Sequence, residues 1–147
     1  MKTIIYSFVL LLLFSCEENK KKFAFNNKLQ ICLLLYPSEN TEDIRYSLNI
    51  LDGNLLIKDY STFKNISYKL KKNEYNHLLL LKNNISKKYD RLNNNVLGSW
   101  GCTLKVENVI YYNDDDFNFK DPPIEIKNLI DYLVKISPIE IELYSFS

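Results

Sequence analysis

The sequence contains few of the residues on which most catalytic and metal-binding motifs depend. Only three of its 147 residues are glycine, and His77 is the one histidine. A glycine-rich phosphate loop, a Gly-x-Ser-x-Gly nucleophile turn and a His-Glu-x-x-His zinc motif therefore cannot be assembled. The absence of a Cys-x-x-Cys spacing argues against redox or zinc motifs of that kind. We therefore expect no cofactor and interpret His77 as a surface or boundary residue of a helix.

An excess of charge of one sign is also missing. Nineteen Lys and Arg oppose eighteen Asp and Glu, which gives a formal net charge of +1. This balance provides no argument for a nucleic-acid partner or for binding to an acidic membrane surface. Alanine occurs once, at Ala24, whereas there are 11 tyrosines and 8 phenylalanines. Because aromatic side chains favour strands and alanine favours helices, the composition predicts more strand than average.

A short apolar run begins the sequence. Lys2 precedes a mostly apolar stretch from Ile4 to Phe14, which is far shorter than the roughly 20 residues of a membrane-spanning helix. A positive residue followed by such a stretch is typical of a signal peptide. The stretch ends in Leu13-Phe14-Ser15-Cys16, and polar residues 17–22 follow at once.

These four residues resemble the lipobox of bacterial lipoprotein precursors, in which an aliphatic, a variable and a small residue precede a cysteine. Phe14 is larger than the residue usual at its position. The resemblance covers residues 1–16 and implies that the Cys16 thiol takes a diacylglycerol group and that the amine freed by cleavage is acylated, for example with palmitate. Two or three acyl chains anchor a protein stably to a bilayer. The alternative is ordinary secretory cleavage, with Cys16 incidental.

The same resemblance predicts where the protein is found. It implies a cell-envelope lipoprotein held to a bacterial membrane through Cys16. In some Gram-negative lineages, acidic residues after the lipidated cysteine look like a signal for export to the surface, and Glu17-Glu18 fits this pattern. We therefore favour the outer membrane or cell surface. Residues 1–15 are predicted to be the signal peptide, 16–27 a polar tether and 28–147 one folded domain.

The hydrophobic pattern predicts a single α+β domain of order β-β-β-β-α-β-β-α-β, with a mainly antiparallel sheet and two helices on one face. Asp52-Gly53 and Glu107-Asn108 are expected to form the tight turns of two hairpins, and Pro122-Pro123 to precede the second helix. We expect the first strand to lie centrally and to be buried on both faces or nearly so. Strands are predicted at residues 29–36, 44–50, 54–60, 66–70, 100–106, 109–112 and 139–143, and helices at 72–88 and 126–134.

Two cysteines remain once Cys16 is lipidated. An exported compartment permits a disulfide between Cys32 and Cys102, which would close a loop of about 70 residues and contribute on the order of 4 kcal/mol. Cys32, however, lies in a strand predicted to be buried, where a free thiol packs as a small apolar group. We favour two separate buried thiols and keep the disulfide as the alternative.

An acidic loop provides the best candidate for a cation site. Asp114, Asp116 and Asn118 have the spacing of calcium ligands, and Glu125 stands at the twelfth position. Phe119, however, occupies the position where the sharp turn of a calcium loop requires glycine. We therefore interpret the segment as a solvated loop and retain calcium as the weaker alternative.

Aromatic residues gather around the second predicted hairpin. Packing within the sheet explains most of them. The alternative is an exposed aromatic surface for a protein or glycan partner, because aromatic rings provide contact area at a low entropic cost. The residues of that predicted partner surface are Trp100, Tyr111, Tyr112, Phe117 and Phe119.

The missing catalytic motifs favour a non-catalytic function. We expect an envelope lipoprotein whose domain binds a protein, as an inhibitor, immunity or assembly factor. The alternative is a small hydrolase, or a glycan-processing or glycan-binding protein, in which the acidic residues 114–116 converge with Glu140 or Glu142. A third hypothesis, ligand transport, predicts a sizeable apolar cavity between sheet and helices.

Overall fold

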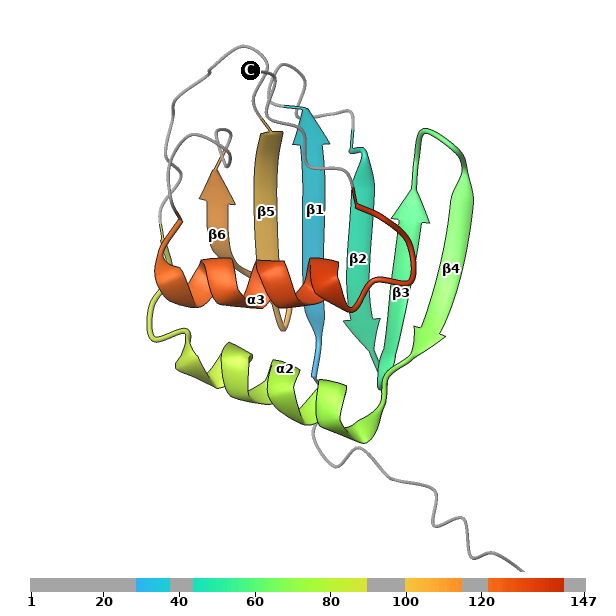
Figure 1. Ribbon diagram of the computed structural model, residues 1–147. Coiled ribbons are helices and arrows are strands. Elements are labelled where there is room, and N and C mark those ends of the chain that lie inside the picture. The colour runs from blue at the N-terminus through green and yellow to red at the C-terminus, as the bar shows by residue number, and fades with distance from the viewer. Residues whose placement is uncertain (1–28, 38–43, 90–99, 115–121, 142–147) are drawn as a thin grey trace, which may run out of the picture.

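The computed structural model of the chain describes residues 29–37, 44–89, 100–114 and 122–141. Within them, two helices pack against one sheet (Figure 1). The helices are α2 (Lys72–Asn84) and α3 (Ile124–Lys135). The strands are β1 (Ile31–Pro37), β2 (Tyr46–Leu51), β3 (Asn54–Asp59), β4 (Lys64–Lys69), β5 (Trp100–Val106) and β6 (Val109–Asp114).

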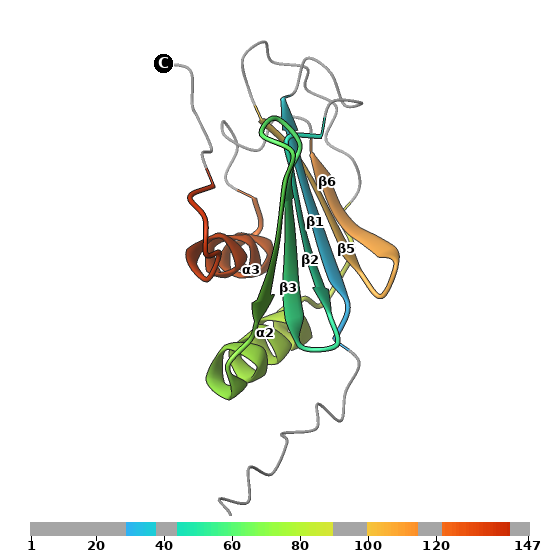
Figure 2. The same cartoon turned by 90° about the vertical axis from the view of Figure 1, so that its right-hand side faces the viewer.

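The six strands form one antiparallel sheet in the order β4-β3-β2-β1-β5-β6. The first strand, β1, is central, because Leu33 lies opposite Leu48 of β2 and Leu104 of β5. Figure 2 shows both helices on the same side of the sheet. The predicted α+β class, the antiparallel sheet and the placement of two helices on one face are confirmed.

Side chains alternate along β1 between a buried face and a less buried one. Leu33 and Leu35 have no exposed surface and face the helices, whereas Cys32 and Leu34 are only partly buried. The expectation that β1 is buried on both faces or nearly so holds fully for one face and only in part for the other, where Tyr36 is buried but Cys32 and Leu34 keep some exposure. This exposure follows from the arrangement of the helices, since a strand is fully buried only where both faces of its sheet are covered.

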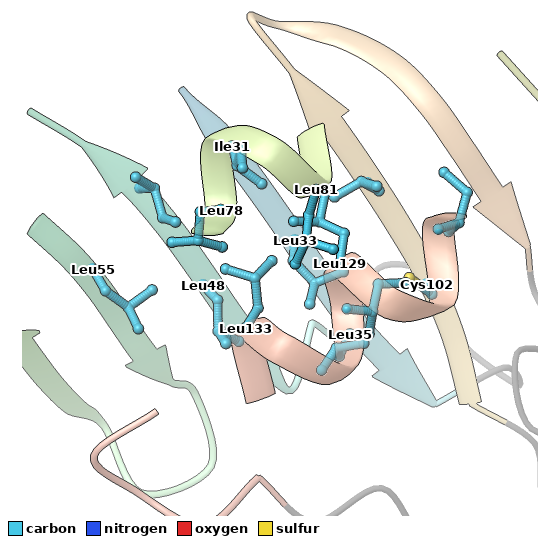
Figure 3. Packing of buried hydrophobic residues seen from close by; sticks show 14 of the residues in the cluster. Ile31, Leu33, Leu35, Leu48, Leu55, Leu78, Leu81, Cys102, Leu129 and Leu133 are labelled. Carbon is cyan, nitrogen blue, oxygen red and sulfur yellow. The ribbon is translucent and has the colours of Figure 1, made fainter. Parts of the chain in front are cut away.

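The core lies between the sheet and the two helices. Figure 3 shows Leu78 and Leu81 of α2 together with Leu129 and Leu133 of α3, all directed at leucines of the central strands. These helical residues recur at spacings of three and four, so each helix presents one apolar stripe to the sheet. Burial of such a side chain contributes about 1.5–3 kcal/mol, which makes this stripe the main reason that the helices form here.

Both predicted hairpin turns are present. In the turn between β2 and β3, Asp52 and Gly53 have φ values of 50° and 72°. In the turn between β5 and β6, Glu107 and Asn108 have φ values of 51° and 64°. Two consecutive residues with positive φ match the right-handed twist of the strands that they connect.

The helix predicted at residues 72–88 ends earlier, at Asn84. Ile85 takes an extended conformation and is buried against the core, so the chain leaves the helix there. Four residues later, the Tyr89 N–H donates to the Tyr111 carbonyl of β6 at 2.8 Å. Burial of Ile85 and pairing with the sheet edge outweigh the helical pattern of the following residues.

The strand predicted at residues 139–143 does not form in residues 139–141, and the rest of it lies outside the described residues. The Ser137 hydroxyl donates to the Ile139 carbonyl at 2.8 Å and accepts from the Ile139 N–H at 3.3 Å. A serine that bonds both backbone groups of a nearby residue competes with strand pairing. The strand predicted from the alternating pattern is therefore wrong for residues 139–141.

A buried carboxylate stabilises the turn between β3 and β4. Asp59 is 8% exposed and accepts hydrogen bonds from the Thr62 hydroxyl at 2.7 Å and from the Ser61 N–H and hydroxyl at 3.0 Å. Arg45, which precedes β2, lies 3.1 Å from the same carboxylate. Desolvation alone would raise the pKa of Asp59, but the hydrogen bonds from Thr62 and Ser61 outweigh it, so the pKa is lowered.

We predict that Asp59→Asn destabilises the fold at neutral pH and weakens its acid sensitivity. The folded-state pKa of Asp59 lies below the unfolded value of about 3.9. Its carboxylate therefore stabilises the fold fully above that value, and the contribution is lost as the pH falls through the folded pKa. We expect a loss of about 1–3 kcal/mol at pH 7 and a flatter dependence of the unfolding free energy on pH below 4, measured by urea titration.

The exposed turn residue Asp52 provides the matched control. Asp52→Asn should change stability at pH 7 by no more than about 0.5 kcal/mol. Identical acid limbs for the wild type and Asp59→Asn would contradict the proposed contribution of Asp59.

Candidate functional site

The sheet face opposite the helices, here called the open face, is not covered by any helix of the described residues (Figure 2). Residues that pair across antiparallel strands share a face, so the strand register defines which side chains lie on it. They are Cys32, Leu34 and Tyr36 of β1, Ser47, Asn49 and Leu51 of β2, Asn54, Leu56 and Lys58 of β3, Asn65, Ser67 and Lys69 of β4, Thr103 and Lys105 of β5, and Ile110 and Asn113 of β6.

A shallow groove of about 420 Å³ crosses the open face near the start of β1. Leu51 and Leu56 form its apolar part and are 43% and 37% exposed. A second hollow of about 390 Å³ adjoins it over β3 and β4. The polar part of the groove is lined by Gln30, Cys32, Asn49, Lys58, Lys105 and Asn108.

The charges on the open face are all positive. Lys58, Lys69 and Lys105 belong to it, and none of its described side chains is a carboxylate. Exposed leucines beside lysines suit a partner with an apolar centre and acidic groups around it. We did not predict this group of exposed leucines and lysines from the sequence. The signal that could have revealed it is the alternation within residues 54–60, which places Leu56 and Lys58 on one face.

The end of the open face over β5 and β6 is closed by its own side chains. The Tyr36 hydroxyl lies 3.4 Å from the Thr103 hydroxyl and donates to the Asn113 side-chain oxygen at 3.3 Å. Thr103 donates to the same oxygen at 2.7 Å. The ring of Tyr36 crosses Gly101, where a Cβ atom would meet it at 2.1 Å. These contacts fill the open face around Gly101, whereas the groove over β1, β2 and β3 and the hollow over β3 and β4 stay accessible.

The two cysteines lie on opposite faces of the sheet. Cys32 is opposite Lys105 on the open face, whereas Cys102 is opposite Leu35 on the core face. Both thiols are free, and side chains on opposite faces cannot be bridged without moving the backbone. The disulfide alternative is therefore wrong. The favoured separate thiols are present, with Cys102 fully buried and Cys32 partly so.

Neither thiol is prepared for nucleophilic chemistry. Burial raises the pKa of Cys32, and the nearby Lys105 only partly opposes this effect. Burial also raises the pKa of Cys102, and the Asp114 carboxylate adds to that shift. Because the thiolate is the reactive form, neither residue is an activated nucleophile at neutral pH.

The cation-site candidates are not brought together in the described residues. Asp114 is completely buried and accepts a hydrogen bond of 2.7 Å from the Tyr112 hydroxyl, so it does not project into a solvated loop. Asp116 and Asn118 lie outside the described residues. Within the described ranges, no three His, Cys, Asp or Glu side chains converge as metal ligands do.

The carboxylates of the enzyme alternative lie in different environments. Asp114 is buried, whereas Glu140 is exposed. The other acidic residues of that hypothesis, Asp115, Asp116 and Glu142, lie outside the described residues. The described part of the chain therefore shows no general acid and base facing each other across a cleft.

The predicted aromatic partner surface is largely part of the core. Trp100 is 7% exposed and stacks on Tyr46 with ring centroids 6.3 Å apart, and Tyr112 has no exposed surface. Tyr111 is partly buried, and the Lys88 ammonium lies 5.9 Å from its ring centroid. Phe117 and Phe119 lie outside the described residues. The prediction that Trp100 and Tyr112 lie on the surface is wrong, because the register of β5 and β6 directs both toward the helices.

The one histidine is an exposed helix residue, as predicted. His77 of α2 packs on Tyr132 of α3, with ring centroids 4.3 Å apart. Beside them, the Tyr68 hydroxyl of β4 lies 3.0 and 3.1 Å from the two Glu74 carboxylate oxygens, and Glu74 also accepts the Lys71 N–H at 2.8 Å. This cluster connects the start of α2 to the sheet and to α3. The cluster was not predictable from the sequence, because Tyr68 and Glu74 meet only through the turn that follows β4.

No protein-family model matches this chain, and no curated protein or solved structure is significantly similar to it. In the part of the chain that the structure describes, no helix is long and apolar enough to cross a membrane. The functional interpretation therefore depends on the geometry of the open face and on the N-terminal sequence.

We predict that the two domain thiols are free and differ in reactivity. Without reductant, the denatured protein should give two thiols per chain with Ellman's reagent in addition to any free Cys16. In the native state Cys32 should react slowly, and Cys102 should react only at the rate of unfolding, because it is fully buried. Cys32→Ser should remove the slow native reaction alone, whereas no reactive domain thiol in denaturant would indicate a disulfide.

We also predict that Gly101→Ala destabilises the open face. The new methyl group would displace the Tyr36 ring and its hydrogen bonds to Thr103 and Asn113, at a cost of about 1–3 kcal/mol in the free energy of unfolding. The same substitution in a Tyr36→Ala background should cost clearly less, because the ring is then absent. Equal costs in the two backgrounds, measured by chemical denaturation, would show that Tyr36 is not the obstacle.

Proposed function

We propose that this protein is a membrane-anchored lipoprotein of the bacterial cell envelope whose domain binds another protein through the open face. The lipobox-like residues 13–16 support acylation of Cys16 and anchoring to the outer membrane or cell surface. The groove over β1, β2 and β3 supports a binding function. An inhibitor, immunity or assembly factor would need both properties.

One observation carries the binding proposal: exposed leucines lie among lysines on a sheet face that the described helices leave uncovered. In an antiparallel sheet with one face in water, that face is usually polar. Leu51 and Leu56 depart from this pattern, and Leu34, elsewhere on the same face, is only partly buried. An apolar centre with a polar rim is the arrangement that protein interfaces share.

The chemistry of the groove suits binding more than catalysis. Its polar side chains are amides and lysines, and the Cys32 thiol keeps its proton. Catalysis by proton transfer needs a group that titrates near neutral pH and faces the reacting bond. Amides, lysines and leucines instead provide shape, hydrogen bonds and charge complementarity.

We predict that a photo-crosslinking residue at Leu56 captures one specific partner in cells. p-Benzoylphenylalanine at Leu56 should give a discrete adduct in the membrane fraction, because Leu56 lines both the groove and the adjoining hollow. The same residue at Ile124, an aliphatic side chain of α3 that is 66% exposed, should give no such adduct. Adducts are measured by immunoblot and mass spectrometry, together with the mass of the Cys16 peptide.

A charge reversal separates specific from incidental capture. Lys58→Glu, placed next to the Leu56 crosslinker, should reduce the adduct at least tenfold if the partner carries acidic groups there, since a close like-charge pair costs well over 1.4 kcal/mol. Lys127→Glu on α3 is the matched control. Equal crosslinking from Leu56 and Ile124, or an unacylated Cys16, would contradict the corresponding half of the proposal.

A further inference from the structure

Positive charge is concentrated around α2, although the chain as a whole is almost neutral. Residues 69–88 contain six lysines and one glutamate, whereas residues 122–141 contain two lysines and three acidic residues. Lys71 and Lys72 are exposed at the start of α2, and Lys87 and Lys88 are exposed just after its end. The overall balance of charge therefore conceals one strongly basic region.

This basic region lies where the chain enters the domain. In Figure 1, α2 crosses the end of the sheet at which β1 begins. The Leu29 N–H, two residues before β1, donates to the Tyr75 hydroxyl of α2 at 3.3 Å. The segment that arrives from the N-terminus thus meets the domain directly against α2.

The distance to the proposed anchor is short. Twelve residues lie between Cys16 and Leu29, so the two positions can be at most about 45 Å apart. A domain held so close to a bilayer repeatedly brings its surface within the roughly 10 Å over which charges act in physiological salt. The end of the domain that joins the tether is the end that the bilayer meets most often.

We propose that the α2 end of the domain lies against the anionic headgroups of the membrane that holds the lipid anchor. This inference rests on the proposed acylation of Cys16. Each lysine near an anionic surface strengthens binding about fivefold, and the lysines at both ends of α2 act together. Leu80 of α2, which is 56% exposed, adds an apolar side chain between them.

The acidic groups around this end do not cancel its charge. Glu107 is paired with Lys82 at 3.2 Å, and Glu74 accepts a hydrogen bond from Tyr68 and lies 3.9 Å from the Lys71 ammonium. Asp52 lies in the turn between β2 and β3, and Glu125 of α3 accepts a hydrogen bond from the Tyr89 hydroxyl and lies near Lys87. Among the described residues around α2, six lysines thus oppose four carboxylates. A positive surplus therefore remains.

This orientation places the open face to one side of the domain. Figure 2 shows the strands extending from the end of the sheet at which α2 lies, so with α2 against the bilayer they would run away from the membrane surface. The groove starts near Gln30 and Cys32, close to the point where β1 begins. A partner bound in the groove would therefore lie next to the membrane. A membrane protein or another lipoprotein would meet this requirement.

The orientation is tested with the acylated full-length mature protein in vesicles of phosphatidylglycerol and phosphatidylcholine that carry a quencher on the lipid headgroups. A fluorophore is attached at Asn76→Cys on α2 or at Phe63→Cys in the turn between β3 and β4, in a Cys32→Ser background. We expect quenching at position 76 to be at least about twice that at position 63. The difference should fall, to the part that the tether alone produces, in pure phosphatidylcholine and in 1 M salt, where charges act over only about 3 Å.

Two sets of charge substitutions provide a matched comparison. Lys72, Lys87 and Lys88→Gln together should weaken docking about a hundredfold, by about fivefold for each lysine, and bring the two quenching values together. Lys64, Lys127 and Lys135→Gln remove the same charge from β4 and α3 and should leave the difference unchanged.

The possible failures are distinguishable. An unmodified Cys16 by mass spectrometry would overturn both the anchor and the orientation. Acylated Cys16 with equal quenching at positions 63 and 76 in anionic vesicles would overturn the orientation alone. Equal loss of the difference in both sets of lysine variants would show that net charge, and not the α2 end, brings the domain to the membrane.

Discussion

The packing of both helices on one face of the sheet is the constraint on which the rest of the structure depends. Two helices of 13 and 12 residues bury the leucines of the central strands on one side only. Every strand must therefore divide its side chains between a dry face and a less covered one. The hydrophobic core, the separation of Cys32 from Cys102 and the exposure of Leu56 all follow from this division.

Much of the fold was predictable because its signals are local. The pair Asp52-Gly53 can adopt the turn that joins β2 to β3, and the apolar spacing in residues 126–134 can bury a single helical stripe. The end of α2 was not predictable in this way. It is set by the burial of Ile85 and the pairing of Tyr89 with β6, which are tertiary contacts that a local pattern does not contain.

The candidate site was harder to predict than the fold. Composition alone directed attention to the aromatic residues, but Trp100 and Tyr112 pack in the core because their positions in β5 and β6 face the helices. In the sequence, the leucines and lysines of the open face look like ordinary strand residues, and only the strand register shows that they share one face. The basic region at α2 was likewise hidden by the net charge, since its significance depends on the Leu29–Tyr75 contact that places it beside the incoming chain.

The pairing of Tyr89 with Tyr111 also affects how the sheet can grow. A segment of the same chain satisfies part of the outer edge of β6, so among the described residues β4 is the edge left open to strand addition. Lys64 and Lys69 place a positive charge at each end of β4, and lysines on an edge strand oppose its pairing with the edge of another sheet. Copies of this domain at high local concentration would thus be discouraged from joining their sheets into aggregates.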